Sequence, residues 1–135
     1  MQSPQREAWA RLPWRRWVGR GVLLGLAAAL LVGVVALLDA REPLIARHAG
    51  LAVWWPAYVA LSVAGFVAVA ALLARWRYAL PALATVQLAQ FIAEAALIGW
   101  GPHLLRIPVV LGLAAWASHV RGPAGRAAAN ITPVA

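Results

Sequence analysis

The feature that most constrains the fold is residues 79–100, ALPALATVQLAQFIAEAALIGW, which are long and apolar enough to cross a bilayer yet contain Gln87, Gln90 and Glu94. At about 100° per residue, these three side chains fall within about 60° of one another on a helix. A carboxylate that faces lipid at bilayer depth costs roughly 2.5–3.5 kcal/mol. We therefore expect other helices to cover this face.

Three further apolar blocks accompany this stretch, at residues 18–38, 52–74 and 104–120. A helix needs about 20 residues to cross the hydrocarbon core. Hydrophobic residues make up 64% of the chain, against about 45–50% in soluble domains. The sequence predicts an all-α polytopic membrane protein, with four transmembrane helices in an antiparallel bundle over residues 18–120.

Two of these blocks have an alternative interpretation. A basic segment followed by the apolar residues 18–38 resembles a signal peptide, but the apolar run exceeds the usual length of about 7–15 residues, so we expect a true span. Residues 104–120 are at the lower length limit, and a tilted or re-entrant helix is the alternative to a full span there.

The distribution of arginine predicts the orientation. All 12 basic residues are Arg, and the net charge is +8. Because the arginines stand at the ends of the apolar blocks, we attribute them to cytoplasmic anchoring and expect no nucleic-acid partner. An N-in, C-in topology places nine arginines inside and three, Arg41, Arg47 and Arg106, outside. The Lys-free, Ala/Arg-rich composition is typical of a GC-rich bacterial gene, so we expect the bacterial cytoplasmic (inner) membrane.

Both chain ends are expected to lie outside the bilayer core. Residues 1–17 are basic and aromatic, and either lie on anionic lipid headgroups or form a partly disordered tail with one Trp anchor. Residues 121–135 are predicted to be a flexible tail. Tryptophans near the ends of the blocks are predicted interface anchors, namely Trp14, Trp17, Trp54, Trp55, Trp76 and Trp100.

Small residues recur at four-residue spacing in the first two blocks. Such a ridge lets another helix backbone approach closely. We predict two packing faces, which are candidate partners for each other: Gly21, Gly25, Ala29 and Gly33 in the first block, and Ala60, Ala64 and Ala68 in the second.

Depth in the membrane predicts which polar groups meet. Glu94 lies about 9 Å inside the outer end of its helix and Arg106 about 3 Å inside the outer end of the next. We expect a Glu94–Arg106 ion pair, with His103 nearby, that neutralises the two costliest intramembrane groups. The polar stripe is interpreted either as interhelical hydrogen bonding that fixes the bundle or as a proton or cation pathway.

The sequence contains no recognisable catalytic or metal-binding pattern. Cys is absent, and no phosphate loop or nucleophile–base motif occurs, so we expect neither an enzyme nor a metal site. Haem in a membrane bundle usually needs two imidazoles at one depth, whereas His48 and His103 lie in connections and His119 lies near the inner face. We predict no cofactor, with haem or a chlorophyll-type pigment as the alternative.

These patterns favour a structural role. The first hypothesis is a small accessory subunit that packs against a larger respiratory, photosynthetic or transport complex, because extramembrane parts are minimal and packing faces are present. The alternative is a small oligomeric transporter or channel in which Gln87, Gln90 and Glu94 line the path. A third hypothesis is a cofactor-holding anchor.

Overall fold

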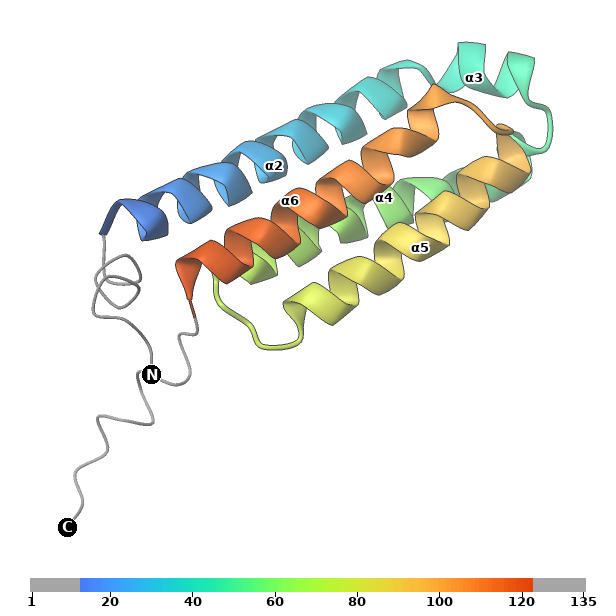
Figure 1. Cartoon of the computed structure of the whole chain (residues 1–135). Helices are drawn as coiled ribbons and strands as arrows, with labels where there is room; N and C mark the ends of the chain where they lie inside the picture. The colour runs from blue at the N-terminus through green and yellow to red at the C-terminus, as the bar shows by residue number, and fades with distance from the viewer. Residues whose placement is uncertain (1–12, 123–135) are drawn as a thin grey trace.

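The computed structural model describes residues 13–122, which form five α-helices, one 3-10 turn and no strand. The predictions for residues 1–12 and 123–135 lie outside this part of the chain. Figure 1 shows the elements in order, with bounds α2 Pro13–Asp39, α3 Arg41–Arg47, α4 Leu51–Leu73, α5 Ala79–Leu97, η1 Pro102–Leu105 and α6 Arg106–Arg121.

Four helical segments are long and apolar enough to cross a membrane: Trp14–Asp39, Leu51–Leu73, Ala79–Leu97 and Pro102–Arg121. For residues 13–122 the prediction of an all-helical structure with four helices able to span a membrane is confirmed. Only 22–28% of each apolar window is buried inside the protein, so most of each helix presents apolar side chains outward. That distribution suits a surface whose solvent is lipid.

The helix boundaries differ from the predicted ones in four places. α2 begins at Pro13 rather than at residue 18, so residues 13–17 of the predicted N-terminal segment belong to the first helix, and proline is tolerated in its first turn. α5 ends at Leu97 rather than at residue 100, because Gly99 takes the left-handed conformation with φ 103° that terminates helices. The connection after the first span contains the short helix α3. The fourth span starts with the 3-10 turn η1, which continues directly into α6.

The four long helices lie side by side (Figure 1). α2 packs against α4 and α6, while α5 packs against α4 and, less extensively, α6. One end of the molecule holds the start of α2, the turn between α4 and α5, and the end of α6. The other end holds α3 and the connection from α5 to α6.

An apolar cluster fills the half of the molecule near the start of α2. Leu23, Val69, Leu83 and Ala114 are completely buried there, one from each long helix. Lipid tails are as apolar as these side chains, so close van der Waals packing stabilises the cluster more than transfer out of the solvent does.

A second apolar cluster lies near α3 and contains Leu51, Trp55 and Tyr58. Leu44 of α3 packs over it. The prediction that Trp55 anchors the interface is wrong, since this side chain is only 7% exposed. Adjacent helical residues point about 100° apart, so Trp54 faces outward while Trp55 faces the cluster.

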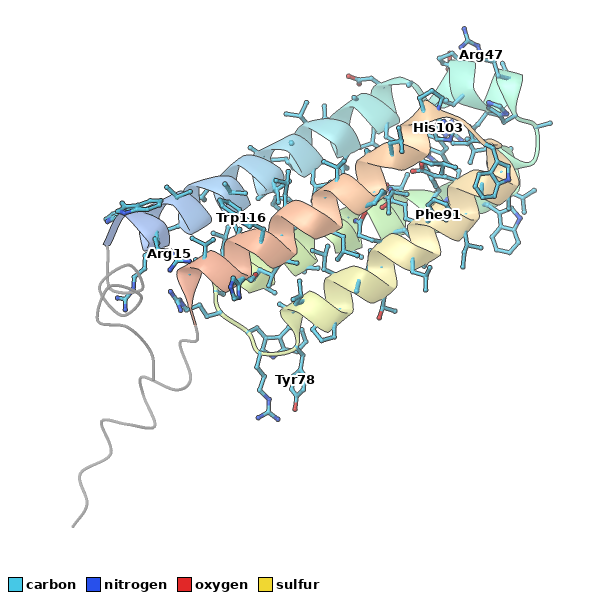
Figure 2. The ribbon with its side chains drawn as sticks, in the orientation of Figure 1. Arg15, Arg47, Tyr78, Phe91, His103 and Trp116 are labelled. Carbon is cyan, nitrogen blue, oxygen red and sulfur yellow. The ribbon has the colours of Figure 1, made fainter. Side chains whose placement is uncertain are left out.

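The other tryptophans predicted to anchor the interfaces have exposed side chains at the two ends of the molecule. Figure 2 marks these ends, with Arg15 and Tyr78 toward one and Arg47 and His103 toward the other. Exposed tryptophans at both ends are typical of the two headgroup layers, and they are Trp14, Trp17, Trp54, Trp76 and Trp100.

The small-residue ridge of α2 does not face the alanines of α4. A Cβ added at Gly21, Gly25 or Gly33 would meet nothing within 4 Å, and Ala29 is exposed. On α4, Ala60 is exposed, Ala64 is half-buried and Ala68 is buried. The expected pairing of the two ridges is therefore wrong, because the larger residues of α2, beginning with Leu23, occupy the inward face.

Two other glycines provide the close approaches. A Cβ on Gly19 would stand 2.5 Å from Cγ of Arg121 and 2.8 Å from the carbonyl oxygen of Ala117, so this glycine lets α2 approach α6. A Cβ on Gly65 would stand 3.2 Å from Nε2 of Gln87, so this glycine makes room for a polar side chain of α5.

Candidate functional site

The polar stripe of α5 is buried. Gln87 is 2% exposed, Gln90 6% and Glu94 0%. They continue the inward face that starts with Ala79 and Leu83, at spacings of four, four, three and four residues. The stripe therefore meets protein instead of lipid.

One oxygen of Glu94 receives bonds from three helices. Tyr58 of α4 donates its hydroxyl proton to Oε1 over 2.8 Å, and Gln90 of α5 donates from Nε2 over 3.3 Å. Arg106, the first residue of α6, forms an ion pair with the same oxygen. The expected ion pair is thus present, and it is one part of a wider buried network.

The network extends along α4 toward the middle of the bundle. Nε2 of Gln90 also lies 3.5 Å from the hydroxyl of Ser62, which donates to the carbonyl oxygen of Tyr58 over 3.1 Å. Gln87 packs against Gly65 one turn further. Tyr58, Ser62 and Gly65 recur at helical spacing, so α4 turns one continuous face toward the stripe.

Arg106 spans the boundary between this network and the surroundings. Its side chain is 50% exposed, while that of its partner Glu94 is fully buried. Nη2 also lies 3.4 Å from the Tyr58 hydroxyl. A long stem lets arginine reach a buried carboxylate while part of the guanidinium stays accessible.

Some polar atoms at the site have no hydrogen-bond partner within residues 13–122. They are Nε2 of Gln87, Oε2 of Glu94 and Nε2 of His103. Most buried polar atoms in proteins are paired with protein or water. A polar ligand or a water molecule could therefore form hydrogen bonds with these atoms.

Two cavities flank Arg106 and Tyr58, which line both. The larger, of about 460 Å³, has an aliphatic wall from α2 and polar groups from Ser62 and Gln90. The smaller, of about 250 Å³, is lined by Glu94 and His103 together with Leu44 and Ile98. The cavities therefore have polar surface for the polar part of a ligand and apolar surface for its apolar part.

Comparisons of the chain with models of known protein families, with curated proteins and with solved structures gave no match. The site is therefore interpreted from its own geometry.

The three histidines do not form a common site. His48 follows the last residue of α3, His103 lies in η1, and His119 lies in the last turn of α6. Among residues 13–122, no group of three His, Asp or Glu side chains is placed to hold a metal ion. Of the three histidines, only His103 lines a cavity with residues of the Glu94 network.

Tyr58 is the site residue that sequence reasoning missed. It stands between Pro56 and Ser62 in a block that is otherwise almost wholly apolar. The available signal was its four-residue spacing to Ser62, which puts two hydroxyls on one helical face. A polar face on the helix adjoining a polar stripe predicts hydrogen bonds between the two.

Proposed function

We propose that this protein is a small accessory subunit of a larger integral-membrane complex and that it binds its partner through the outer face of α2. The observation that carries this proposal is the exposed ridge formed by Gly21, Gly25, Ala29 and Gly33. A Cβ on any of its three glycines would meet nothing within 4 Å, and its second half, Ala29 and Gly33, also forms the rim of the larger cavity. Small residues in register favour close contact between membrane helices. Respiratory, photosynthetic and transport complexes are all candidates for the partner.

The membrane arrangement that we propose is an antiparallel four-span bundle with both termini inside a bacterial cytoplasmic membrane. Six described arginines at one end of the molecule support this orientation, against three at the other. The six are Arg15, Arg16, Arg20, Arg75, Arg77 and Arg121. In this orientation the basic start of the chain adjoins anionic headgroups.

Cysteine labelling tests this orientation cleanly, because the chain has no cysteine of its own. Ala49 and Ala74 are exposed and lie at opposite ends of α4. In intact cells, a membrane-impermeant maleimide should label the Ala49→Cys variant and spare Ala74→Cys. The reverse pattern would contradict the N-in, C-in topology.

The partner interface is tested with a matched pair of glycine substitutions. Gly25 on α2 and Gly112 on α6 are both exposed, and a Cβ on either would meet nothing within 4 Å. Both positions are open and exposed, so leucine at either is expected to preserve the fold, which circular dichroism checks. Gly25→Leu should abolish co-purification of the larger partner from native membranes in mild detergent, while Gly112→Leu should retain it.

Two results would contradict the accessory role. One is recovery of the wild-type chain only as a monodisperse monomer. The other is loss of the partner in both variants, which would show that the α2 face has no special part in binding. Mass spectrometry of the co-purified material then identifies the complex.

The alternative proposal is a small oligomeric transporter or channel. The buried stripe of Gln87, Gln90 and Glu94 and the adjoining cavity of about 460 Å³ support it. The completely buried Leu23 and Val69 of the first apolar cluster count against a path through a single bundle. Proton or cation flux in proteoliposomes that disappears in Glu94→Gln would favour transport over the accessory role.

A further inference from the structure

The smaller cavity contains two buried polar atoms that the described protein leaves without a partner. Oε2 of Glu94 and Nε2 of His103 accept or donate no hydrogen bond within residues 13–122, and both residues line this cavity of about 250 Å³. A carboxylate oxygen that has lost water costs free energy unless a donor replaces it. The cavity therefore suits a ligand with several N–H donors.

The imidazole is held in place by the backbone before η1. A Cβ on Gly101 would stand 2.9 Å from Nδ1 of His103, so the absence of a side chain there lets the ring pack against the chain. Leu104, in the same turn, is 5% exposed and fixes η1 to the bundle. His103 is thus a built part of the cavity wall.

The charges at the site favour a ligand that carries both a positive and a negative group. Glu94 and Arg106 already form a neutral pair, so a lone cation would leave an uncompensated charge in a region of low dielectric constant. Arg106 uses Nη2 for Glu94 and Tyr58, and its half-exposed guanidinium has further donors for an anion. A cationic group at Glu94 joined to an anionic group at Arg106 keeps the site neutral.

The larger cavity adds an apolar continuation. It shares Arg106 and Tyr58 with the smaller one and is walled by Leu30, Val34 and Leu37 of α2. An aliphatic wall beside a guanidinium matches the junction between a phospholipid headgroup and its acyl chains. A free zwitterion would use the polar cavity and leave this wall unused.

We propose that the two cavities together bind a phospholipid with a phosphoethanolamine headgroup. The primary ammonium donates to Oε2 of Glu94 and to Nε2 of a neutral His103 whose ring proton is on Nδ1. The phosphate accepts from Arg106, and an acyl chain lies along α2. This inference goes beyond the accessory role and does not depend on it, because lipid binding requires no partner protein.

Native mass spectrometry of the full-length protein in detergent tests this proposal without any variant. Phosphatidylethanolamine, phosphatidylcholine and phosphatidylglycerol with identical acyl chains are added at equal concentration. Phosphatidylcholine keeps the phosphate and the positive charge but has no N–H donor. We expect phosphatidylethanolamine to bind roughly tenfold more tightly than either, because ammonium-to-carboxylate hydrogen bonds of this kind discriminate by about that factor.

A substitution assigns the selectivity to the cavity. His103→Leu should reduce the preference for phosphatidylethanolamine over phosphatidylcholine, whereas His48→Leu, a histidine outside this cavity, should leave it unchanged. Circular dichroism checks that both variants fold. Glu94→Gln should remove the preference and retain phosphatidylglycerol binding through Arg106.

Three outcomes would overturn the proposal. Equal binding of phosphatidylethanolamine and phosphatidylcholine excludes recognition of the ammonium group. Preferred binding of phosphatidylglycerol makes the site a simple anion site at Arg106. Binding of soluble glycerophosphoethanolamine without retention of the lipid assigns the cavity to a free zwitterion and removes the role of the α2 wall.

Discussion

The Tyr58 hydroxyl donates a 2.8 Å hydrogen bond to Oε1 of Glu94 and so joins α4 to α5 inside the bundle. Tyr58 is 4% exposed and Glu94 is 0% exposed. Because Arg106 of α6 pairs with the same oxygen, one carboxylate oxygen connects three helices. Hydrocarbon has no hydrogen-bond donors that could replace Tyr58 or Arg106. The loss of either side chain is therefore expected to lower the stability of the protein.

The first prediction concerns the hydroxyl of Tyr58. Tyr58→Phe should lower the free energy of unfolding by about 0.6–2 kcal/mol, the range of interhelical hydrogen bonds in membranes. Titration with a denaturing detergent in mixed micelles, followed by tryptophan fluorescence, measures this change. The control is Tyr78→Phe, since Tyr78 is 50% exposed; equal effects of the two substitutions would mean that the buried bond contributes nothing.

The second prediction is an asymmetry between the two halves of the ion pair. Arg106→Gln leaves a fully buried carboxylate without its cation and should cost about 3–5 kcal/mol. Glu94→Gln removes the buried charge itself, and the half-exposed Arg106 side chain can turn to headgroups or water. The second substitution should therefore cost less, about 1–3 kcal/mol.

The double variant completes this test. With both charges gone, its stability should lie close to that of Glu94→Gln alone, so the two single effects should not add. Additive losses in the same unfolding assay would show that the two side chains do not interact. Equal losses for the two single variants would contradict the asymmetry.

The third prediction compares two neighbouring glycines of α2. Gly19→Ala puts a methyl group 2.5 Å from Cγ of Arg121 and 2.8 Å from the carbonyl oxygen of Ala117, and such overpacking typically costs 1–3 kcal/mol. Gly21→Ala meets nothing within 4 Å and should stabilise the helix by about 0.5–1 kcal/mol. In thermal or detergent unfolding, Gly19→Ala should lower the free energy of unfolding and Gly21→Ala should raise it. A change in the same direction for both variants would place the α2–α6 contact elsewhere.

The polar stripe and its arginine could be predicted because both follow from simple periodicity and depth. Gln87, Gln90 and Glu94 share a helical face whatever surrounds them, and a carboxylate in a span needs a cover. Only Arg106 has a charge at a similar depth on the following helix, so its approach to Glu94 followed from distances along the chain.

What the sequence could not predict was which face of the uniformly apolar helices α2 and α4 points inward. Gly21, Gly25 and Gly33 form a regular ridge, but helix rotation is decided by the packing of larger residues such as Leu23, and the ridge faces outward. Trp55 is buried beside an exposed Trp54 for the same reason. Tyr58 belongs to the site because the rotation of α4 that buries Trp55 also turns Tyr58 inward. In a uniformly apolar helix, the sequence pattern shows little of which face is buried.

The fourth prediction concerns Arg121, whose guanidinium caps the end of α4. Nη1 donates to the carbonyl oxygen of Leu72 over 2.8 Å and Nη2 donates to that of Leu73 over 3.1 Å. Carbonyls in the last turn lack amide partners within their own helix, although that of Leu72 also accepts from the Arg75 amide over 3.0 Å. The chain reverses here through Arg75, whose φ of 61° is strained for a residue other than glycine.

Arg121→Leu should therefore loosen the turn after α4 while the rest of the bundle stays folded. Amide hydrogen exchange around Arg75 should accelerate by roughly tenfold or more, because the two charge-assisted bonds together contribute at least the equivalent free energy. Arg121→Lys keeps the favourable charge at the helix end but loses the fork that reaches two carbonyls, so its exchange should be intermediate. Arg77→Leu is the control, since this exposed arginine bonds only to Tyr78 among residues 13–122. Unchanged exchange in Arg121→Leu, or equal acceleration in the control, would mean that solvent or lipid headgroups satisfy these carbonyls as well as the arginine does.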